Sequence, residues 1–115
     1  MRRYRLQDLP PSGTHIFSGL VPDEFICEGA LRFRPPGYIA HPEEPIHAHD
    51  LHEVFVIWQG KARMRLADRV EELGPGDVAV AEPNEDHHLE IDETDPALYV
   101  YFQFGPERHP EQRGR

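Results

Sequence analysis

The sequence predicts an all-β domain, and three observations support this fold class. Apolar and polar residues alternate over short segments, turn-forming residues recur about every ten residues, and no segment keeps the apolar period of a helix. The chain has 115 residues with 12 prolines and 9 glycines, which suffices for one core and favours many turns. We therefore expect a single domain over residues 1–115, built as a sandwich or a barrel.

Short strands are expected between the turn signals, in chain order. They cover residues 25–33, 53–59, 62–66, 78–81, 87–91 and 98–104. Pro35-Pro36-Gly37 closes the first strand and Gly60 closes the second. The core is expected over about 14–105. The polar or proline-rich ends, 1–13 and 106–115, are expected to be loosely held and flexible.

The strand 53–59 is apolar on both faces. If Glu53 points inward, Phe55 and Ile57 do so as well, and the opposite face carries Val54, Val56 and Trp58. A strand that is apolar on both faces must be covered on both. Either the N-terminal segment or a second subunit supplies the cover, and a homodimer is the preferred expectation.

Charge and cysteine content exclude several classes of protein. Acidic residues number 21 against 12 basic ones, and the formal charge of −9 repels phosphate backbones and anionic membranes. We expect no nucleic-acid partner and no membrane partner. The sequence shows no secretory signal or membrane span, and the single cysteine, Cys27, fits a reducing compartment, so a cytoplasmic location is expected. Cys27 itself is interpreted as a buried apolar side chain.

The segment 47–53 has the spacing of a metal site. His47 and His49 are two residues apart, so on an extended chain both point to one side. Glu53 follows four residues later and returns a carboxylate to that side if the chain turns at Asp50 and Leu51. Imidazole and carboxylate groups are common metal ligands. His52, out of register with these residues, is expected to point outward or to orient a loop.

The spacing His47-x-His49-x-x-x-Glu53, with Gly60 after it, resembles the first signature of the cupin superfamily. Gly76-Asp77 followed by Pro83, Asn84 and His87 is similar to the second signature. The chain departs from the pattern in places. Nine residues separate Gly37 from His47 where the family has five, Asn84 replaces a glycine, and Ile91 stands where an asparagine sometimes follows. Asn84 tolerates the left-handed backbone that glycine provides.

The second signature offers two adjacent histidines, His87 and His88. If His87 faces inward, so do Leu89 and Ile91, which leaves His88 and Glu90 on the solvent face. The opposite register would bury Glu90 and expose Leu89 and Ile91. We therefore predict His87 as a ligand. His88 remains the alternative if a bulge at Asp86 reverses the count.

The resemblance implies a cupin-type double-stranded β-helix, or jelly-roll barrel, with a metal held by His47, His49, Glu53 and His87 and two coordination positions left open. Such nitrogen and oxygen ligands suit a divalent transition metal: Fe, Mn, Ni, Co, Cu or Zn. The expected function is action on a small organic molecule in the barrel, as a dioxygenase or an isomerase. The alternative is a non-catalytic cupin module that binds or senses a small ligand.

Other residues give weaker signals. Tyr99, Tyr101 and Gln103 share one strand face, which is interpreted mainly as outer surface or interface and otherwise as the lining of a polar cavity. Arg32 and Arg34 are interpreted mainly as solvated partners of the acidic surface, although one of them could reach a substrate carboxylate. The loop 38–46 is expected at the surface, with residues 40–45 as a possible rim of the barrel mouth.

Overall fold

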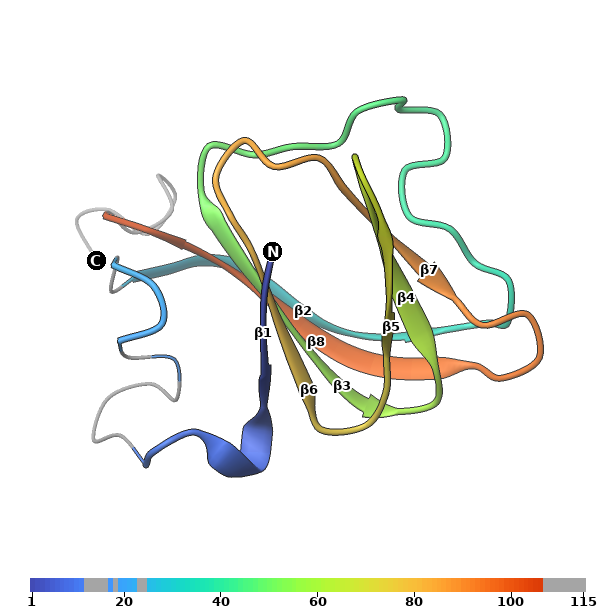
Figure 1. Ribbon diagram of the computed structural model, residues 1–115, viewed down its shortest axis with the longest axis horizontal. Coiled ribbons are helices and arrows are strands. Elements are labelled where there is room, and N and C mark those ends of the chain that lie inside the picture. Colours follow the sequence, from blue (N-terminus) through green and yellow to red (C-terminus); the bar gives the residue numbers. More distant parts are fainter. Residues whose placement is uncertain (12–16, 18, 23–24, 107–115) are drawn as a thin grey trace.

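Two antiparallel sheets face each other in the computed structural model (Figure 1), which describes residues 1–11, 17, 19–22 and 25–106. The strands are β1 (Arg2–Arg5), β2 (Phe25–Arg34), β3 (His52–Gln59), β4 (Ala62–Leu66), β5 (Val70–Leu73), β6 (Asp77–Ala81), β7 (His87–Ile91) and β8 (Ala97–Gly105). The only helical element among the described residues is a 3-10 turn, Leu6–Asp8. The predicted all-β class is confirmed. Six of the strands were predicted to within one residue at either end.

The larger sheet has the order β1-β6-β3-β8-β2 and the smaller one the order β5-β4-β7. β3 lies at the centre of the larger sheet, where Phe55 pairs with Ala79 of β6 and with Tyr101 of β8. In the smaller sheet Met64 of β4 pairs with Leu89 of β7. This arrangement is a β-sandwich. It brings the start of β7 opposite the start of β3.

The main core fills the space between the two sheets. Phe55 and Ile57 from β3 pack there with Met64, Leu89 and Ile91 from the smaller sheet, all of them buried. The predicted inward face of β3 is therefore correct. Because every strand here alternates its side chains, Glu53 is placed on this same inner face and is carried into the space between the sheets.

The outer face of the larger sheet carries a second apolar cluster. Val54 and Val56 of β3 are buried there together with Phe17 and Val21. Of the two covers expected for this face, the chain's own N-terminal segment is therefore the one that the structure shows. Trp58 lies at a bulge in the pairing of β3 with β8 and is 56% exposed. The homodimer stays a prediction.

The loop after β2 runs along the free edge of β7. The N–H of Ala40 donates to the carbonyl of Leu89 (2.9 Å), and the N–H of Ile91 donates to the carbonyl of Tyr38 (2.8 Å). The N–H of Gly37 donates to the carbonyl of Asp92 (2.8 Å). The loop 38–46 is thus tied to the smaller sheet along its first residues, and it bridges the two sheets on this side of the sandwich.

Two turns of the cupin-like signatures depend on left-handed backbone. Gly60 has φ +83°, and an added Cβ would lie 1.9 Å from the carbonyl oxygen of Pro96, so only glycine fits there. Asn84 has φ +63°, which confirms the interpretation that asparagine supplies the conformation usually given by glycine. The turn at Asn84 places β7 so that its first residue, His87, meets the loop before β3.

Three expectations are wrong. Residues 1–13 were expected to be loose, yet in their described part, 1–11, Arg2–Arg5 forms β1 on the edge of β6, held by ion pairs from Arg3 and Arg5 to Asp77, while residues 12 and 13 lie outside the described residues. His88 and Glu90 were expected on a solvent face but are 8% and 4% exposed, because the loop after β2 covers them. Cys27 is half-buried at a bulge of β2 rather than buried. Residues 107–115, expected to be flexible, lie outside the described residues.

The missed strands have weak sequence signals. β1 contains Tyr4 as its only apolar residue, among three arginines, and β5 is only four residues long with two glutamates at its centre. Both are edge strands, whose pairing depends on the neighbouring strand more than on their own pattern. No helix in the described part of the chain is long and apolar enough to cross a membrane.

Candidate metal centre

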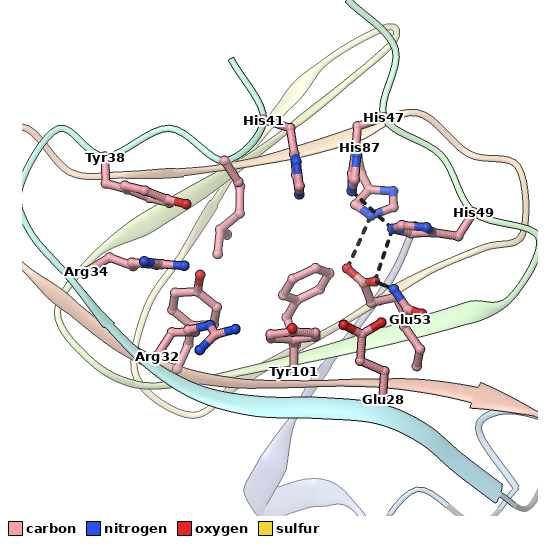
Figure 2. A pocket seen from close by; sticks show the side chains of 15 residues that line it. Glu28, Arg32, Arg34, Tyr38, His41, His47, His49, Glu53, His87 and Tyr101 are labelled. Carbon is pink, nitrogen blue, oxygen red and sulfur yellow. Dashed lines mark hydrogen bonds and ion pairs between the residues drawn. The ribbon is translucent and has the colours of Figure 1, made fainter. Parts of the chain in front are cut away.

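The four side chains predicted as metal ligands meet at one end of the sandwich interior. His47 and His49 come from the loop before β3, Glu53 from β3 and His87 from the first position of β7. The three histidines each offer a ring nitrogen within 4.8 Å of the others. The Glu53 carboxylate lies 3.3 Å from Nε2 of His87 and 3.4 Å from Nε2 of His49 (Figure 2).

Backbone hydrogen bonds hold the two chain segments of this site together. The N–H of His87 donates to the carbonyl of His47 (2.9 Å), and the N–H of Asn84 donates to the carbonyl of His49 (2.5 Å). The N–H of His47 also donates to Oδ1 of Asp86 (2.8 Å). The loop before β3 is therefore fixed to the turn before β7 at three points. These bonds keep His87 close to His47 and His49, although it is far from them in sequence.

Two histidines are oriented through their second ring nitrogen. Nδ1 of His87 donates to the carbonyl of Glu85 (2.9 Å), and Nδ1 of His47 donates to Oε2 of Glu44 (2.7 Å). In a neutral imidazole this leaves Nε2 as the nitrogen with a free lone pair. Such support of a ligating histidine by a carboxylate or a carbonyl is usual at metal sites. Glu44 was missed as an orienting residue, although its position three residues before His47 was the available signal.

The electrostatics of Glu53 and the histidines are linked. Burial alone would raise the pKa of Glu53, but hydrogen bonds from His87 and Gln103 outweigh it and lower that pKa. Burial would lower the pKa of His87, but its bonds to Glu53 and to the carbonyl of Glu85 raise it. Burial lowers the pKa of His47 although its bond to Glu44 opposes this. Glu53 is thus ionised at neutral pH, and His47 is uncharged.

The donor set fits a divalent transition metal. Nε2 of His47 and Nε2 of His49 are 3.0 Å apart, so two lone pairs would face each other unless a proton or a cation lies between them. Three imidazole nitrogens and a carboxylate suit Fe, Mn, Ni, Co, Cu or Zn. Gln103 donates from Nε2 to Oε2 of Glu53 (2.7 Å) and leaves the other carboxylate oxygen toward His87.

The other histidines that the structure describes, His41, His52 and His88, lie outside this group. Nδ1 of His88 lies 3.4 Å from the carbonyl of Ala40, and its Nε2 lies 3.2 Å from Asp86, on the outer side of β7. Nε2 of His52 lies 3.1 Å from Glu82. The structure therefore brings His87 rather than His88 to the predicted ligands. The ring of His41 stacks on that of His47 with centroids 3.8 Å apart, a contact that the sequence did not indicate.

A cavity of about 260 Å³ opens beside the candidate site, between β2, β8, the loop after β2 and β7. Tyr99, Tyr101 and Gln103 line it, so the less favoured interpretation of that strand face, a polar cavity lining, is correct. Arg32 and Arg34 of β2 also line it; Arg34 is half-buried, whereas Arg32 is exposed and therefore solvated, as expected. Figure 2 shows the arginines at one end of the cavity and the histidines at the other.

Comparison with known proteins identifies the family. The profile of the Cupin domain matches residues 35–102, which contain all four candidate ligands and most strands. The chain belongs to the cupin superfamily. The extra residues between Gly37 and His47, which depart from the cupin signature, include the part of the loop that pairs with β7 and also carry Glu44 and His41. Among curated proteins, none matches this chain at a significant level.

Solved structures share the fold of this cupin at low sequence identity. A cupin-like protein from Thermotoga maritima superposes with a TM-score of 0.60 at 18% identity over 66% of this chain and 55% of that one. A cupin protein from Bacteroides fragilis gives 0.59 at 20% identity, covering 76% of this chain and 75% of that one. KdgF from a Halomonas species gives 0.53 at 23% identity, covering 70% and 69%. The matched chain spans little more than half of the Thermotoga protein.

Proposed function

We propose that this cupin is a metal-dependent enzyme that acts on a small organic molecule bound in its cavity. The observation that carries the proposal is that three histidine nitrogens and a buried carboxylate converge on the wall of a 260 Å³ cavity. His47, His49, Glu53 and His87 are the residues that would hold the ion. Enzymes commonly place a metal where a concave site leaves coordination positions to the substrate.

The chemistry divides between the metal and the protein. A bound divalent ion would supply Lewis acidity or, with iron, a route to oxygen chemistry, which corresponds to the isomerase and the dioxygenase hypotheses. Gln103 holds the Glu53 carboxylate by a 2.7 Å hydrogen bond, and Phe55 and Leu89 line the apolar part of the cavity. These residues fix the ligand geometry and reduce the water around a bound molecule.

Metal analysis is the first test. Protein purified without chelators or nickel resin should contain close to one equivalent of a divalent transition metal. His87→Ala should weaken metal binding about a hundredfold or more, because it removes a ligand. His52→Ala is the matched control, since His52 neighbours Glu53 but contacts Glu82 instead. Equal affinity in both variants would contradict the proposed site.

Chelation gives a second readout of the same test. Binding to the folded chain alone stabilises it by about 2.7 kcal/mol at a hundredfold excess of metal over Kd. EDTA should therefore lower the melting temperature of metal-loaded wild type and leave that of His87→Ala almost unchanged. If EDTA removed the metal from wild type and the melting temperature did not change, the proposal would be contradicted.

Nitric oxide tests whether the metal site is open to a diatomic ligand, which the dioxygenase hypothesis requires. Anaerobic Fe(II)-loaded protein with an open coordination position should give a paramagnetic nitrosyl spectrum. Failure to give it, with Fe(II) bound, would favour the alternative of a cupin that binds or senses a ligand without oxygen chemistry. The closed double-stranded β-helix barrel, the homodimer and the cytoplasmic location stay predictions alongside this proposal.

A further inference from the structure

Two arginines of β2 stand apart from the others in this chain. Neither Arg32 nor Arg34 forms an ion pair with a carboxylate of the described residues, although the protein has 21 acidic residues. Each of the other arginines that the structure describes does: Arg2 with Glu82, Arg3 and Arg5 with Asp77, Arg63 and Arg65 with Glu90, and Arg69 with Asp68 and Glu71. The two exceptions both line the cavity.

Aromatic rings support the two guanidinium groups. The Arg34 guanidinium carbon lies 4.4 Å from the ring centroid of Tyr38, and that of Arg32 lies 5.9 Å from the ring centroid of Tyr101. A guanidinium group held against a ring face keeps its N–H edge available for an anion. Nε of Arg34 is buried and has no hydrogen-bond partner. Arg34 also lines the cavity, so a ligand there can reach the side chain.

The charge on the cavity wall also favours an anion. Apart from the histidines, its charged side chains are the cations Arg32 and Arg34 and the carboxylates Glu28 and Glu53, two of each sign. A divalent ion at the histidines makes the wall net positive, although the whole chain carries a formal charge of −9. A positive cavity in an acidic protein attracts a negatively charged molecule to that cavity and away from the rest of the surface.

We propose that the cavity binds a small organic acid, with its carboxylate on Arg32 and Arg34 and its oxygen donors directed to the histidine end. This inference rests on the proposed function for the metal end, while the arginine end is carried by its own contacts. Tyr99, which is 4% exposed, lies beside this end, and burial raises its pKa although Arg34 opposes this, so its hydroxyl stays protonated as a further donor.

A carboxylate suits this end better than a phosphate. Guanidinium and carboxylate groups are both planar and form two parallel hydrogen bonds. Phosphate sites commonly add backbone N–H groups from a helix N-terminus or a glycine-rich loop. Within the described ranges, the residues that line the cavity belong to strands and to the single loop that joins β2 to β3, and none of them is a glycine.

Matched ligands test the proposal. Zinc-loaded protein is titrated calorimetrically with 2-oxoglutarate and 2-oxoadipate, which differ in the reach of their distal carboxylate, and with 2-oxopentanoate, which has the same chelating end without that carboxylate. At least one diacid should bind about tenfold or more tightly than 2-oxopentanoate, because hydrogen bonds between a carboxylate and a guanidinium group contribute about that much. Equal affinities for all three compounds would overturn the proposal.

Variants assign the preference to the arginines. Arg34→Met and Arg32→Met should each reduce the preference for the diacid severalfold or more while metal affinity stays as in wild type. Arg34→Lys keeps the charge but not the planar guanidinium, and should retain part of the preference. Arg69→Met is the control, because Arg69 pairs with surface carboxylates away from the cavity. Unchanged preference in folded Arg34→Met and Arg32→Met would refute the assignment.

Two further binding measurements are needed. One tests the arginine site independently of the metal, and the other tests whether a phosphate is the preferred ligand. On metal-free protein, butyrate should still bind more tightly than butyramide, which has the same length without the charge, and Arg34→Met should reduce the difference. That result would uphold the arginine site even if no metal binds, whereas loss of the difference in wild type would count against it. The affinity ratio of 3-phosphoglycerate to glycerate is also compared with that of the diacids to 2-oxopentanoate. A larger ratio for the phosphate compound would show that the arginine end binds a phosphate rather than a carboxylate.

Discussion

Two buried glutamates, Glu53 and Glu90, lie in opposite sheets and have very different surroundings. They are 5% and 4% exposed. Glu90 accepts hydrogen bonds from Arg63 (2.9 Å) and Arg65 (2.5 Å), two permanent cations on the neighbouring strand β4. Glu53 faces two imidazoles and the Gln103 amide instead. One carboxylate is neutralised by the protein itself, and the other lies among groups that can accept a metal ion.

This comparison shows that a buried carboxylate can either stabilise the fold or take part in a metal site. A buried charge is tolerated when it is paired and hydrogen-bonded. The hydrogen bond from Arg65 is the main cause that lowers the pKa of Glu90, and Arg63 adds to it against the effect of burial. The pKa of Glu53 is lowered against burial by hydrogen bonds from His87 and Gln103 and by the nearby His49, with no permanent cation among these causes. We therefore expect the two glutamates to respond oppositely in tests of stability and of metal binding.

Glu53→Gln should give the largest effect. The change keeps the shape of the side chain and removes the negative charge next to the metal, so metal affinity should fall at least a hundredfold, or about 2.7 kcal/mol. Competition with a colorimetric chelator would measure the affinity. The metal-free variant should remain folded by circular dichroism. A variant that binds metal like wild type, or one that fails to fold, would contradict the assignment of Glu53 to the metal.

Glu90→Gln should produce the reverse pattern at a smaller scale. Arg63 and Arg65 would lose their common charged acceptor, and the free energy of unfolding should fall by about 2 kcal/mol. Metal affinity should stay as in wild type, because Glu90 points to the outer side of β7. Urea denaturation of metal-free protein would measure the loss, with Glu53→Gln beside it. If Glu90→Gln weakened metal binding as much as Glu53→Gln, the two roles would not be separate.

The same pair shows how far sequence reasoning reaches. The spacing of His47, His49 and Glu53 and the period of two along β7 were enough to select the four residues that the structure brings together. The selection of His87 over His88 rested partly on a wrong premise, that burial would exclude Glu90. A period of two reports which residues share a face, whereas it does not show that a distant loop covers the outer face and that arginines neutralise the buried charge there.

Residues outside the signatures could not be assigned in the same way. Glu44, Arg32 and Arg34 lie in segments without a family pattern, and their roles depend on how the loop after β2 pairs with β7. That pairing is made by backbone groups of Tyr38 and Ala40, which leave no trace in side-chain periodicity. Long-range backbone contacts of this kind position the cavity, and a single sequence does not encode them in a readable form.

The smallest effect in this comparison concerns pH. The pKa of Glu90 in the folded protein lies below its ordinary value, so Glu90 contributes stability that is fully present at neutral pH and is lost as pH falls through the folded pKa. Unfolding free energies of wild type and Glu90→Gln, both metal-free, should differ by about 2 kcal/mol at pH 7 and by less than about 1 kcal/mol near pH 3.

Other carboxylates, such as Asp77 with Arg3 and Arg5, titrate in both proteins, so the difference between the two isolates Glu90. Guanidinium groups stay charged throughout this range, so the change with pH comes from the carboxylate. A difference that stays at its neutral value down to pH 3 would contradict titration of Glu90 as its source, because glutamine has nearly the same shape and does not titrate. Glu90 would then lose its contrast with Glu53, whose charge is the property that metal binding requires.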